Sequence, residues 1–507
     1  MQLKTKFLKW STGVPVVMLN KKTAEELGIH SQDRISIKTL SSNPKEFATI
    51  VNVIERIVKK DEIAVSSELK HRLKLRFGQR VEIGLADAPK SLDLIKRKLA
   101  GKKLNKKEIN IIIQDIVDNS LSESEVALFI SAMYKNGMTK KETIFLIKAI
   151  LKTGNTLSFN NKYVVDKHSI GGIPGNRTTP IVVSICAAEG LTMPKSSSRA
   201  ITSAAGTADV IETIANVEFS IEQLEKIVNK TNACMVWGGA LGMVPADSKI
   251  IRIEKMLKID PEAQLLASIM SKKLASDSKY ILIDIPYGEF AKVKKDKALD
   301  LKKKFESLGK YFKKKLKVVL TDGNNPIGNG VGPSLELIDV IKVLDPKQEG
   351  PRDLEKKSLY LSGEIFEMTG KAKKGKGKEL AEGILDSGKA FQKFKQIIKA
   401  QGGHINGNTN SKNKKIAKIK DAEFKETIIS NKKGKVISID NKKIATLARV
   451  AGCPVDKLAG LYLHVKSNYE INKGDKIITI YAESKTRLKQ AICFYQKEKP
   501  IKLGRNL

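Results

Sequence analysis

The amino-acid sequence predicts a multidomain protein that combines α+β and α/β architecture. Three observations predict this. The chain has 507 residues, which is more than a single hydrophobic core usually holds. Short runs of alternating apolar and polar residues occupy the first 84 positions, as in strands, and helix-period apolar stripes follow them. From about residue 162, strands alternate with helices, which favours an α/β domain, here with a mixed sheet.

These patterns divide the chain into four expected domains. They are an N-terminal β-barrel-like domain (1–84), a helical domain (85–161 plus about 250–275), a central α/β phosphate-binding domain (162–249 plus about 276–405) and a C-terminal α/β domain (406–507).

The first domain is predicted from four strand-like runs, at 34–37, 47–54, 62–65 and 80–83. A weak internal repeat with a spacing of 46 residues relates its two halves. Leu27, Ile29, Arg34, Ile35 and Ile37 recur as Leu73, Leu75, Arg80, Val81 and Ile83. A duplicated β unit predicts a small pseudo-symmetric barrel of the double-psi kind, and a chance match is the alternative.

The helical domain is predicted from three capping boxes, in which a polar N-cap residue is followed three positions later by Glu. They are Asn105/Glu108, Ser122/Glu125 and Thr139/Glu142. Apolar residues recur at helical spacing after each box, which is typical of a bundle core rather than of a cofactor site.

The central domain opens with an apolar run, Tyr163–Val165, that is followed by the polar stretch 166–169 and a glycine turn at 171–176. A helix is expected to begin near Thr178 or Thr179, with Pro180 in its first turn. Glycines let backbone N–H groups approach a ligand, and a helix N-terminus favours negative charge, so this strand–turn–helix predicts an anion site. Further strands are expected at 280–285 and 317–320.

A second polar loop, at 195–207, follows a short hydrophobic connection and is rich in hydroxyl groups. Two donor-rich loops so close in sequence predict two walls of one pocket for phosphate and sugar. Ordinary loop and capping chemistry remains the alternative for either loop.

The segment 260–275 carries a polar stripe on a predicted helix. Asp260 is expected as its N-cap and Pro261 as its first residue. Asp260, Gln264, Ser268 and Lys272 follow one another at i, i+4 spacing. Such a stripe can line a cleft, or it can be a solvated face behind a capping aspartate.

Charge and composition limit the classes of function. The net charge of +37 comes from 92 Lys and Arg against 55 Asp and Glu, so nucleic-acid binding has to be considered. The excess is spread along the chain. Its only runs, 371–378 and 411–420, lack interleaved aromatic residues for base stacking. We interpret it as a lysine-rich surface that attracts phosphorylated substrates.

Motifs for metals, dinucleotides and membranes are not evident in the sequence. The four cysteines are far apart and form no CxxC pair, which favours reduced thiols in a cytoplasmic protein. The first residues lack a signal-peptide core, and no run approaches the length of a membrane span. No metal-ligand set and no GxGxxG fingerprint occur, so neither a metal nor a dinucleotide cofactor is expected.

Several of these motifs together carry a family resemblance. They are KHSIGG (167–172), PGNRTT (174–179), SSSRAITSAAGTADVIE (196–212), VPADSKI (244–250), LLASIMSKKLA (265–275) and TDGNNPIGNGVGPSLE (321–336). In this order they resemble the thymidine and pyrimidine-nucleoside phosphorylase family, and most of all its archaeal nucleotide branch, the AMP phosphorylases. The resemblance covers nearly the whole chain. It implies that AMP and phosphate become adenine and ribose 1,5-bisphosphate, with phosphate as co-substrate and no cofactor. It also implies a homodimer or a larger assembly built through the C-terminal domain.

The resemblance implies a role for individual residues. The implied phosphate ligands are Lys167, Ser169, Thr178 and Ser197, with Thr207. The implied AMP contacts are Gly172, Ser198, Arg199, Ala200, Ile201, Thr202, Ser203, Thr207, Ser268 and Lys292. Lys272 is a possible contact to the base, and Arg252 corresponds to a base-binding arginine except that its spacing differs by one residue. Around Lys292 the chain has Glu289 and Phe290, where the family has a glycine-rich approach.

Asp260 matches the family's proposed proton donor to the leaving base. It lies on a helix that, by the same resemblance, faces the phosphate loops across an interdomain cleft. Adenine gains a proton as its glycosidic bond breaks, and a carboxyl group can supply one if burial keeps it protonated.

Three alternatives remain open at this stage. A pyrimidine-nucleoside phosphorylase shares most of the motifs, although the N-terminal barrel and Asp260 favour the nucleotide enzyme. A phosphoribosyltransferase has a similar build but normally needs an acidic cluster for magnesium diphosphate. A nucleic-acid-binding protein would rest on charge alone. The sequence does not rank AMP above CMP, UMP, GMP or IMP.

Overall fold

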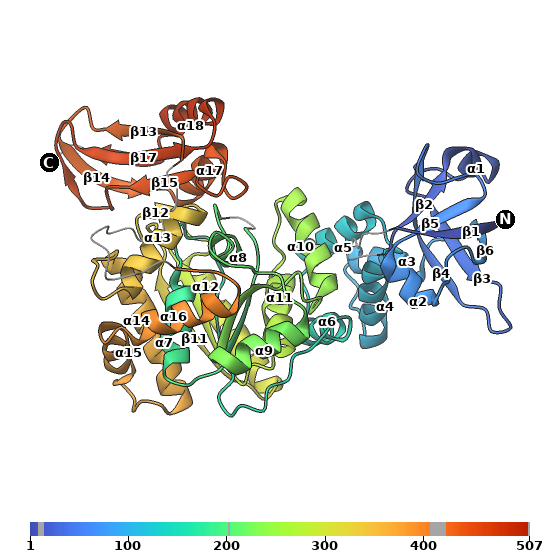
Figure 1. Ribbon diagram of the computed structural model, residues 1–507, viewed down its shortest axis with the longest axis horizontal. Coiled ribbons are helices and arrows are strands. Elements are labelled where there is room, and N and C mark those ends of the chain that lie inside the picture. Colours follow the sequence, from blue (N-terminus) through green and yellow to red (C-terminus); the bar gives the residue numbers. More distant parts are fainter. Residues whose placement is uncertain (9–14, 201–202, 406–421, 505–507) are drawn as a thin grey trace. The chain divides into compact units, whose positions relative to one another are not determined.

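The computed structural model describes residues 1–8, 15–200, 203–405 and 422–504 (Figure 1). The chain forms two compact units, each described by itself below. The first unit comprises Met1–Thr156 and Gly242–Ala275, and the second comprises Leu157–Leu241 and Ser276–Leu507. The return to the first unit therefore occurs at residue 242, ahead of the expected position near 250.

The N-terminal part of the first unit is a closed six-stranded barrel with the strand order β1-β5-β2-β4-β3-β6. Its elements are β1 Gln2–Phe7, β2 Val17–Asn20, α1 Lys21–Glu26, β3 Arg34–Thr39, β4 Glu46–Ile54, β5 Glu62–Val65, α2 Ser67–Leu73 and β6 Arg80–Leu85. The order strand–strand–helix–strand occurs twice, and α2 and β6 begin 46 residues after α1 and β3. In the antiparallel β3–β6 pair, Ile37 lies opposite its repeat partner Ile83. The barrel prediction is confirmed, whereas the double-psi crossing stays a prediction.

The rest of the first unit is a helical bundle. Its helices are α3 Lys90–Leu99, α4 Lys106–Val117, α5 Glu123–Asn136, α6 Lys140–Lys152, α10 Pro245–Leu257 and α11 Glu262–Ala275. All three predicted capping boxes form, at Asn105, Ser122 and Thr139. A buried ion pair joins Lys98 of α3 to Glu142 of α6 (2.8 Å). The helices α10 and α11 pack against this bundle, α10 on α4 and α5 and α11 on α5 and α6.

A small parallel sheet lies at the centre of the second unit. Its strands are β7 Val165–Ser169, β10 Tyr280–Tyr287 and β11 Lys315–Asp322, in the order β11-β10-β7. A second parallel pair, β8 Met193–Ser197 and β9 Ala233–Trp237, continues from it through a bridge between Val164 and Thr192. These pairs are all parallel, so the expectation of a mixed sheet is wrong for them. Since parallel strands end at one edge, β7 and β8 deliver their polar carboxyl ends to the same side.

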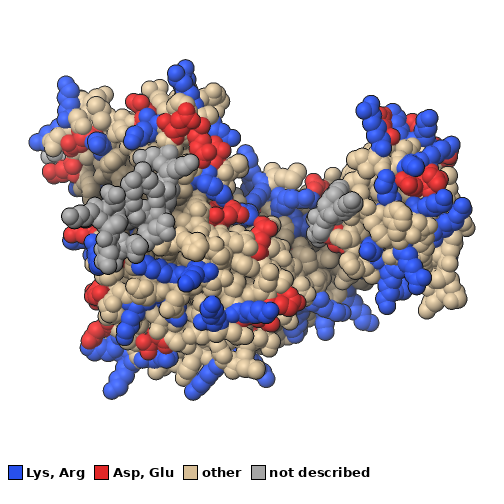
Figure 2. All heavy atoms as spheres, in the orientation of Figure 1, with Lys and Arg blue, Asp and Glu red and all other residues tan. Residues whose placement is uncertain are grey.

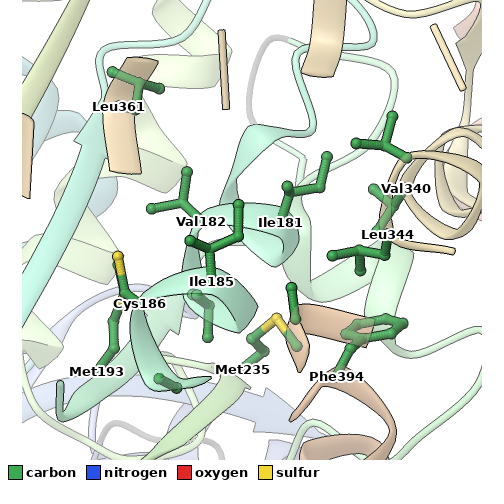
Figure 3. Packing of buried hydrophobic residues seen from close by; sticks show 14 of the residues in the cluster. Ile181, Val182, Ile185, Cys186, Met193, Met235, Val340, Leu344, Leu361 and Phe394 are labelled. Atoms are coloured by element: carbon green, nitrogen blue, oxygen red, sulfur yellow. The ribbon is translucent and has the colours of Figure 1, made fainter. Parts of the chain in front are cut away.

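Helices cover this sheet and bury an extensive apolar core. They are α7 Thr178–Ala188, α8 Thr207–Ile211, α9 Ile221–Thr231, α12 Lys295–Tyr311, α13 Pro333–Leu344, α14 Arg352–Thr369, α15 Gly377–Asp386 and α16 Lys389–Ala400. Figure 3 shows Ile185 of α7 between Met235 of β9 and neighbouring helices, with Phe394 of α16 close by. The core holds α7 rigidly, so its N-terminus is a fixed feature.

The C-terminal part of the second unit contains two antiparallel sheets and two helices. Its elements are β12 Gly330–Val331, β13 Phe424–Ile429, β14 Gly434–Ile439, α17 Asn441–Ala451, β15 Gly460–Leu463, β16 Glu470–Ile471, β17 Lys476–Ala482, α18 Lys485–Glu498 and β18 Ile501–Gly504. The sheet orders are β12-β15-β17-β13 and β16-β14-β18. Antiparallel pairing makes this part α+β, not α/β as expected, because sequence runs do not reveal strand direction.

The positive charge does not gather in one place on the visible face. In Figure 2, Lys and Arg side chains are scattered among Asp and Glu. The run 411–420 lies outside the described residues. Within the described ranges, no helix is both long and apolar enough to cross a membrane.

Candidate functional site

Lys167 lies on β7 and is almost fully buried, with 1% of its surface exposed. Its Nζ donates a hydrogen bond to Oγ1 of Thr178 (2.6 Å), the first residue of α7. Burial lowers the pKa of Lys167 to about 7; the carboxylate of Asp284 opposes this shift, and nearby cations add to it. Because the Thr178 oxygen accepts from a cation, its own hydrogen is available to donate to an anion. Two predicted phosphate ligands are thus in direct contact.

The glycine turn after β7 brings together two further predicted residues. Gly172 has a φ of +92°, a conformation that residues with a side chain rarely adopt. A Cβ built there would lie 2.9 Å from the Cβ of Lys292. Only glycine therefore lets the turn approach Lys292 so closely, despite the unusual Glu289 and Phe290 nearby. At the start of the same turn, the Ser169 hydroxyl lies 3.5 Å from the amide nitrogen of Gly171.

Arg177 connects the two polar loops, and the sequence interpretation did not assign it a role. Its Nε donates to Glu336 (2.7 Å), one terminal nitrogen to Oγ1 of Thr207 (2.8 Å) and the other to the carbonyl of Ala205 (2.7 Å). Glu336 is 1% exposed, and burial raises its pKa. A positive charge thus stands between Thr178 and Thr207. The signal that could have found it is its place in PGNRTT, directly before the helix.

The second loop begins at the end of β8. Buried Lys195 donates to Asp166 (2.9 Å) and to the carbonyl of Lys167 (2.8 Å), which joins β8 to β7. The Ser197 hydroxyl donates to the carbonyl of Val236 (3.2 Å), and that of Ser203 to Ala205 (2.8 Å). Ser198 is exposed. Ile201 and Thr202 lie outside the described residues.

Arg199 is held by carboxylates rather than left open to solvent. Its guanidinium makes two hydrogen bonds to Glu212 (both 2.6 Å) and one to Glu218 (3.0 Å), and it lies 4.7 Å from the ring of Trp237. The hydrogen bond from Arg199 holds the pKa of Glu212 at about 2, and the same bond raises the pKa of Arg199. Its side chain is therefore committed to shaping the loop that was predicted to contact AMP.

In the first unit, Asp247 organises the predicted base contacts. This residue of α10 is fully buried. Its carboxylate accepts hydrogen bonds from Gln264 (2.9 Å) and Ser268 (3.0 Å) of α11, and it pairs with Lys272 (2.8 Å). Lys272 also donates to the Ser268 hydroxyl (3.0 Å). The stripe Gln264–Ser268–Lys272 thus faces a buried acid, not solvent. Asp247 belongs to the quoted VPADSKI motif, but its role was missed.

Asp260 occupies a different position from the one expected. The helix α11 begins at Glu262, because the carbonyl of Pro261 accepts its first bond, from Leu265 (3.0 Å). The prediction of Asp260 as N-cap and Pro261 as first helical residue is wrong by one residue. Asp260 is exposed. Arg252 pairs with Glu123 of α5.

Within the described ranges, no group of three or more His, Cys, Asp or Glu side chains is arranged to hold a metal ion.

Comparisons with known proteins add three matches to family models. The helical bundle domain of a glycosyl transferase family matches residues 92–154, and the α/β domain of a glycosyl transferase family matches residues 161–391. A pyrimidine nucleoside phosphorylase C-terminal domain matches residues 435–502. Among solved structures, anthranilate phosphoribosyltransferase from Thermus thermophilus has a TM-score of 0.51 at 17% identity, and the match covers 61% of this chain and 100% of that one. That likeness shows a shared fold.

Full-length relatives decide the family. The AMP phosphorylase of Pyrococcus horikoshii is 45% identical over 504 residues, covering 99% of this chain and 98% of that protein. The AMP phosphorylase of Methanococcus aeolicus is 39% identical over 502 residues, covering 99% and 97%. The chain belongs to the AMP phosphorylase family. The alignments with these relatives include the N-terminal barrel, which the three domain models leave unmatched.

Proposed function

We propose that this protein catalyses the phosphorolysis of AMP, in which phosphate displaces adenine and ribose 1,5-bisphosphate is formed. The observation that carries the proposal is identity of 39–45% with AMP phosphorylases over 99% of the chain. The reaction transfers a pentosyl group, so the protein is a glycosyltransferase. Its co-substrate is inorganic phosphate, and the proposed chemistry needs no cofactor.

The phosphate site is the strand–turn–helix around Lys167. Lys167 supplies charge, Ser169, Thr178 and Ser197 supply hydroxyl groups, and the N-terminus of α7 adds its dipole. The contact between Lys167 and Thr178 supports this assignment. Held below the sugar, phosphate attacks the anomeric carbon as the glycosidic bond breaks, without a covalent enzyme intermediate. Catalysis here depends on holding the nucleophile in place. The translational and rotational entropy is then lost on binding rather than in the transition state, which accounts for much of such rate enhancements.

The nucleotide is held by the second loop and by the close pair Gly172–Lys292. The Lys292 ammonium group suits the 5′-phosphate, which distinguishes a nucleotide from a nucleoside. Residues Ser198–Ser203, with Thr207, supply backbone and hydroxyl donors. Arg177 holds this loop in place through its hydrogen bonds to Thr207 and to the carbonyl of Ala205.

Residues of the first unit are proposed to contact the leaving base. Ser268 and Lys272, oriented by Asp247, contact adenine, and Asp260 donates the proton that adenine takes up. Asp260 is exposed in the chain by itself.

A panel assay tests the proposed function. Purified protein is incubated with phosphate and, separately, with AMP, CMP, UMP, GMP, IMP, adenosine and thymidine, and base release is followed. We expect nucleotides to be cleaved much faster than nucleosides, with AMP among the best. Faster cleavage of thymidine or adenosine than of AMP would contradict the proposal.

We further infer a cytoplasmic homo-oligomer that assembles through the C-terminal domain. The family resemblance supports the homo-oligomer. The cytoplasmic location is supported by the four cysteines, which are free thiols, three of them buried. Light scattering on the same preparation should show at least two chains per particle, and a monomer at working concentration would contradict the inference.

A further inference from the structure

A charged network joins the predicted nucleotide loop to the C-terminal part of the second unit. Three carboxylates, of Asp209, Glu212 and Glu218, surround the guanidinium of Arg199 at 2.6–3.6 Å. The ammonium group of Lys457 completes this Arg199 network. It lies 2.7 Å from Glu212 and 3.8 Å from Asp209. Lys457 is 245 residues distant from Glu212 in sequence and has no part in the chemistry proposed above.

The network controls the shape of the loop. One oxygen of Asp209 accepts hydrogen bonds from the backbone N–H of Ala200 (2.7 Å) and of Gly206 (2.8 Å), so this single carboxylate fixes both sides of the loop. A Cβ on Gly206 would lie 2.3 Å from the carbonyl oxygen of Ser198, which shows how closely the two sides approach. Displacement of Asp209 would therefore move the backbone of the nucleotide loop at Ala200 and at Gly206.

Lys457 reaches this network from a rigid support. The carbonyl of Lys457 accepts a hydrogen bond from the N–H of Ser334 in α13 (3.2 Å). On either side of it, Cys453 and Ala459 pack against Gly332 so tightly that a Cβ on that glycine would lie 2.9 Å from the Cys453 sulfur and 2.6 Å from the Ala459 carbonyl. The ammonium group is thus presented from a fixed backbone, at a small entropic cost to the contact.

We propose that Lys457 is a positioning residue for the nucleotide loop, through which the C-terminal domain sets the affinity for AMP. This inference rests on the proposed function and assigns the C-terminal domain a task other than assembly. Without Lys457, three carboxylates would face one guanidinium, and their repulsion would shift Asp209 and the backbone N–H groups that it holds. The surplus negative charge would also oppose an anionic substrate.

The test compares Lys457→Met with Lys443→Met as a matched control. Lys443 lies in the same domain, has a similar exposure (38% against 34%) and pairs with Glu498. Because Lys457 is partly exposed, the expected effect is moderate: the KM for AMP and the Kd for AMP alone, from calorimetry, rise about 5–10-fold. The KM for phosphate and kcat stay within about twofold, and Lys457→Arg restores the AMP affinity.

Each other outcome contradicts the proposal. An unchanged AMP affinity contradicts it, as does an equal loss of AMP and phosphate affinity. The same loss in Lys443→Met, or a fall in Tm that Lys457→Arg does not recover, would indicate a purely structural role. The proposed function fails separately: wild-type protein that binds AMP through Lys457 but releases no adenine contradicts phosphorolysis and leaves the positioning role intact.

Discussion

Polar groups are positioned in opposite ways around Lys167 and around Asp247, the two residues at the centre of the proposed phosphate site and of the proposed base contacts. Around Lys167, cations lie buried beside hydroxyl groups and a helix N-terminus, and burial lowers the pKa of the lysine. Around Asp247, one buried carboxylate binds Ser268 and Lys272, the side chains that are proposed to contact the base. The proposed proton donor, Asp260, lies outside that arrangement and is exposed.

The difference shows which part of the site is prepared before substrate binds. A buried cation without a full counter-charge is costly, and that cost is recovered only when an anion arrives. We therefore expect the proposed phosphate site near Lys167 to be formed before phosphate binds. Ser268 and Lys272 are likewise oriented in advance, whereas Asp260 acquires its proposed function only in the presence of a base.

The largest effect is expected for Asp260→Asn. If Asp260 donates a proton to adenine, turnover of AMP falls by roughly 10²–10⁴-fold, the usual contribution of general acid catalysis, because the amide has no acidic proton. The wild-type rate should also fall as pH rises, since the acid has to carry its proton. Base release and Tm are measured together.

The control for Asp260→Asn is built into the substitution. Asn preserves the shape and the hydrogen-bond acceptor, so Tm should hold. A folded variant with near-full activity on AMP would reduce Asp260 to a structural role at the start of α11.

A smaller effect, on the order of 10–100-fold in kcat/KM for AMP, is expected for Asp247→Asn. A hydrogen bond to a charged group contributes about 1.5–3 kcal/mol, and here the carboxylate orients both Ser268 and Lys272. The KM for phosphate should change little. Steady-state kinetics with each substrate varied in turn will measure the difference.

Glu123→Gln is the matched control for Asp247→Asn, because Glu123 pairs with Arg252 in the same unit but is 48% exposed. If both substitutions lower AMP turnover equally, Asp247 acts on folding and not on the base contacts. Unchanged kinetics in Asp247→Asn would likewise remove its organising role.

The mildest test varies pH alone and uses sulfate, a phosphate analogue that stays a dianion, as competitor. Sulfate should bind the protonated form of Lys167. With a pKa of about 7, this lysine is charged below pH 7 and loses its proton above it. The inhibition constant for sulfate should therefore be flat below about pH 7 and rise roughly tenfold per pH unit above it. At constant ionic strength, a constant value from pH 6 to 9 would contradict anion binding by a Lys167 whose pKa is about 7.

Local patterns in the sequence predicted the elements of the fold and the strand–turn–helix, because capping boxes, glycines and apolar periods act over a few residues. The start of α7 at Thr178 and the three capped helices are confirmed. Strand direction was not predictable, since parallel and antiparallel runs share the same alternation. The mixed central sheet and the α/β C-terminal domain were therefore wrong.

Long-range side-chain contacts were the other limit. Arg177 donates a hydrogen bond to Glu336, which is 159 residues away in the sequence. Asp247 of α10 accepts one from Ser268 of α11. No spacing rule connects such pairs, so the sequence placed Ser268 and Lys272 correctly on one stripe but did not show that they face an acid. For the same reason Arg199 was predicted as an AMP contact without its carboxylate partners. The N-cap error at Asp260 is of the usual size for helix boundaries.

Strand β12 belongs in sequence to the segment before α13, yet it pairs with β15, with Gly330 opposite Tyr462 and Val331 opposite Leu461. The C-terminal sheet is thus not a detachable module. A deletion after residue 405 would strip β12 of its partner, and a fragment that began at 422 would lack one edge of its own sheet. Gene fusions, domain exchanges and truncations in this family should therefore carry residues 330–331 together with the C-terminal strands.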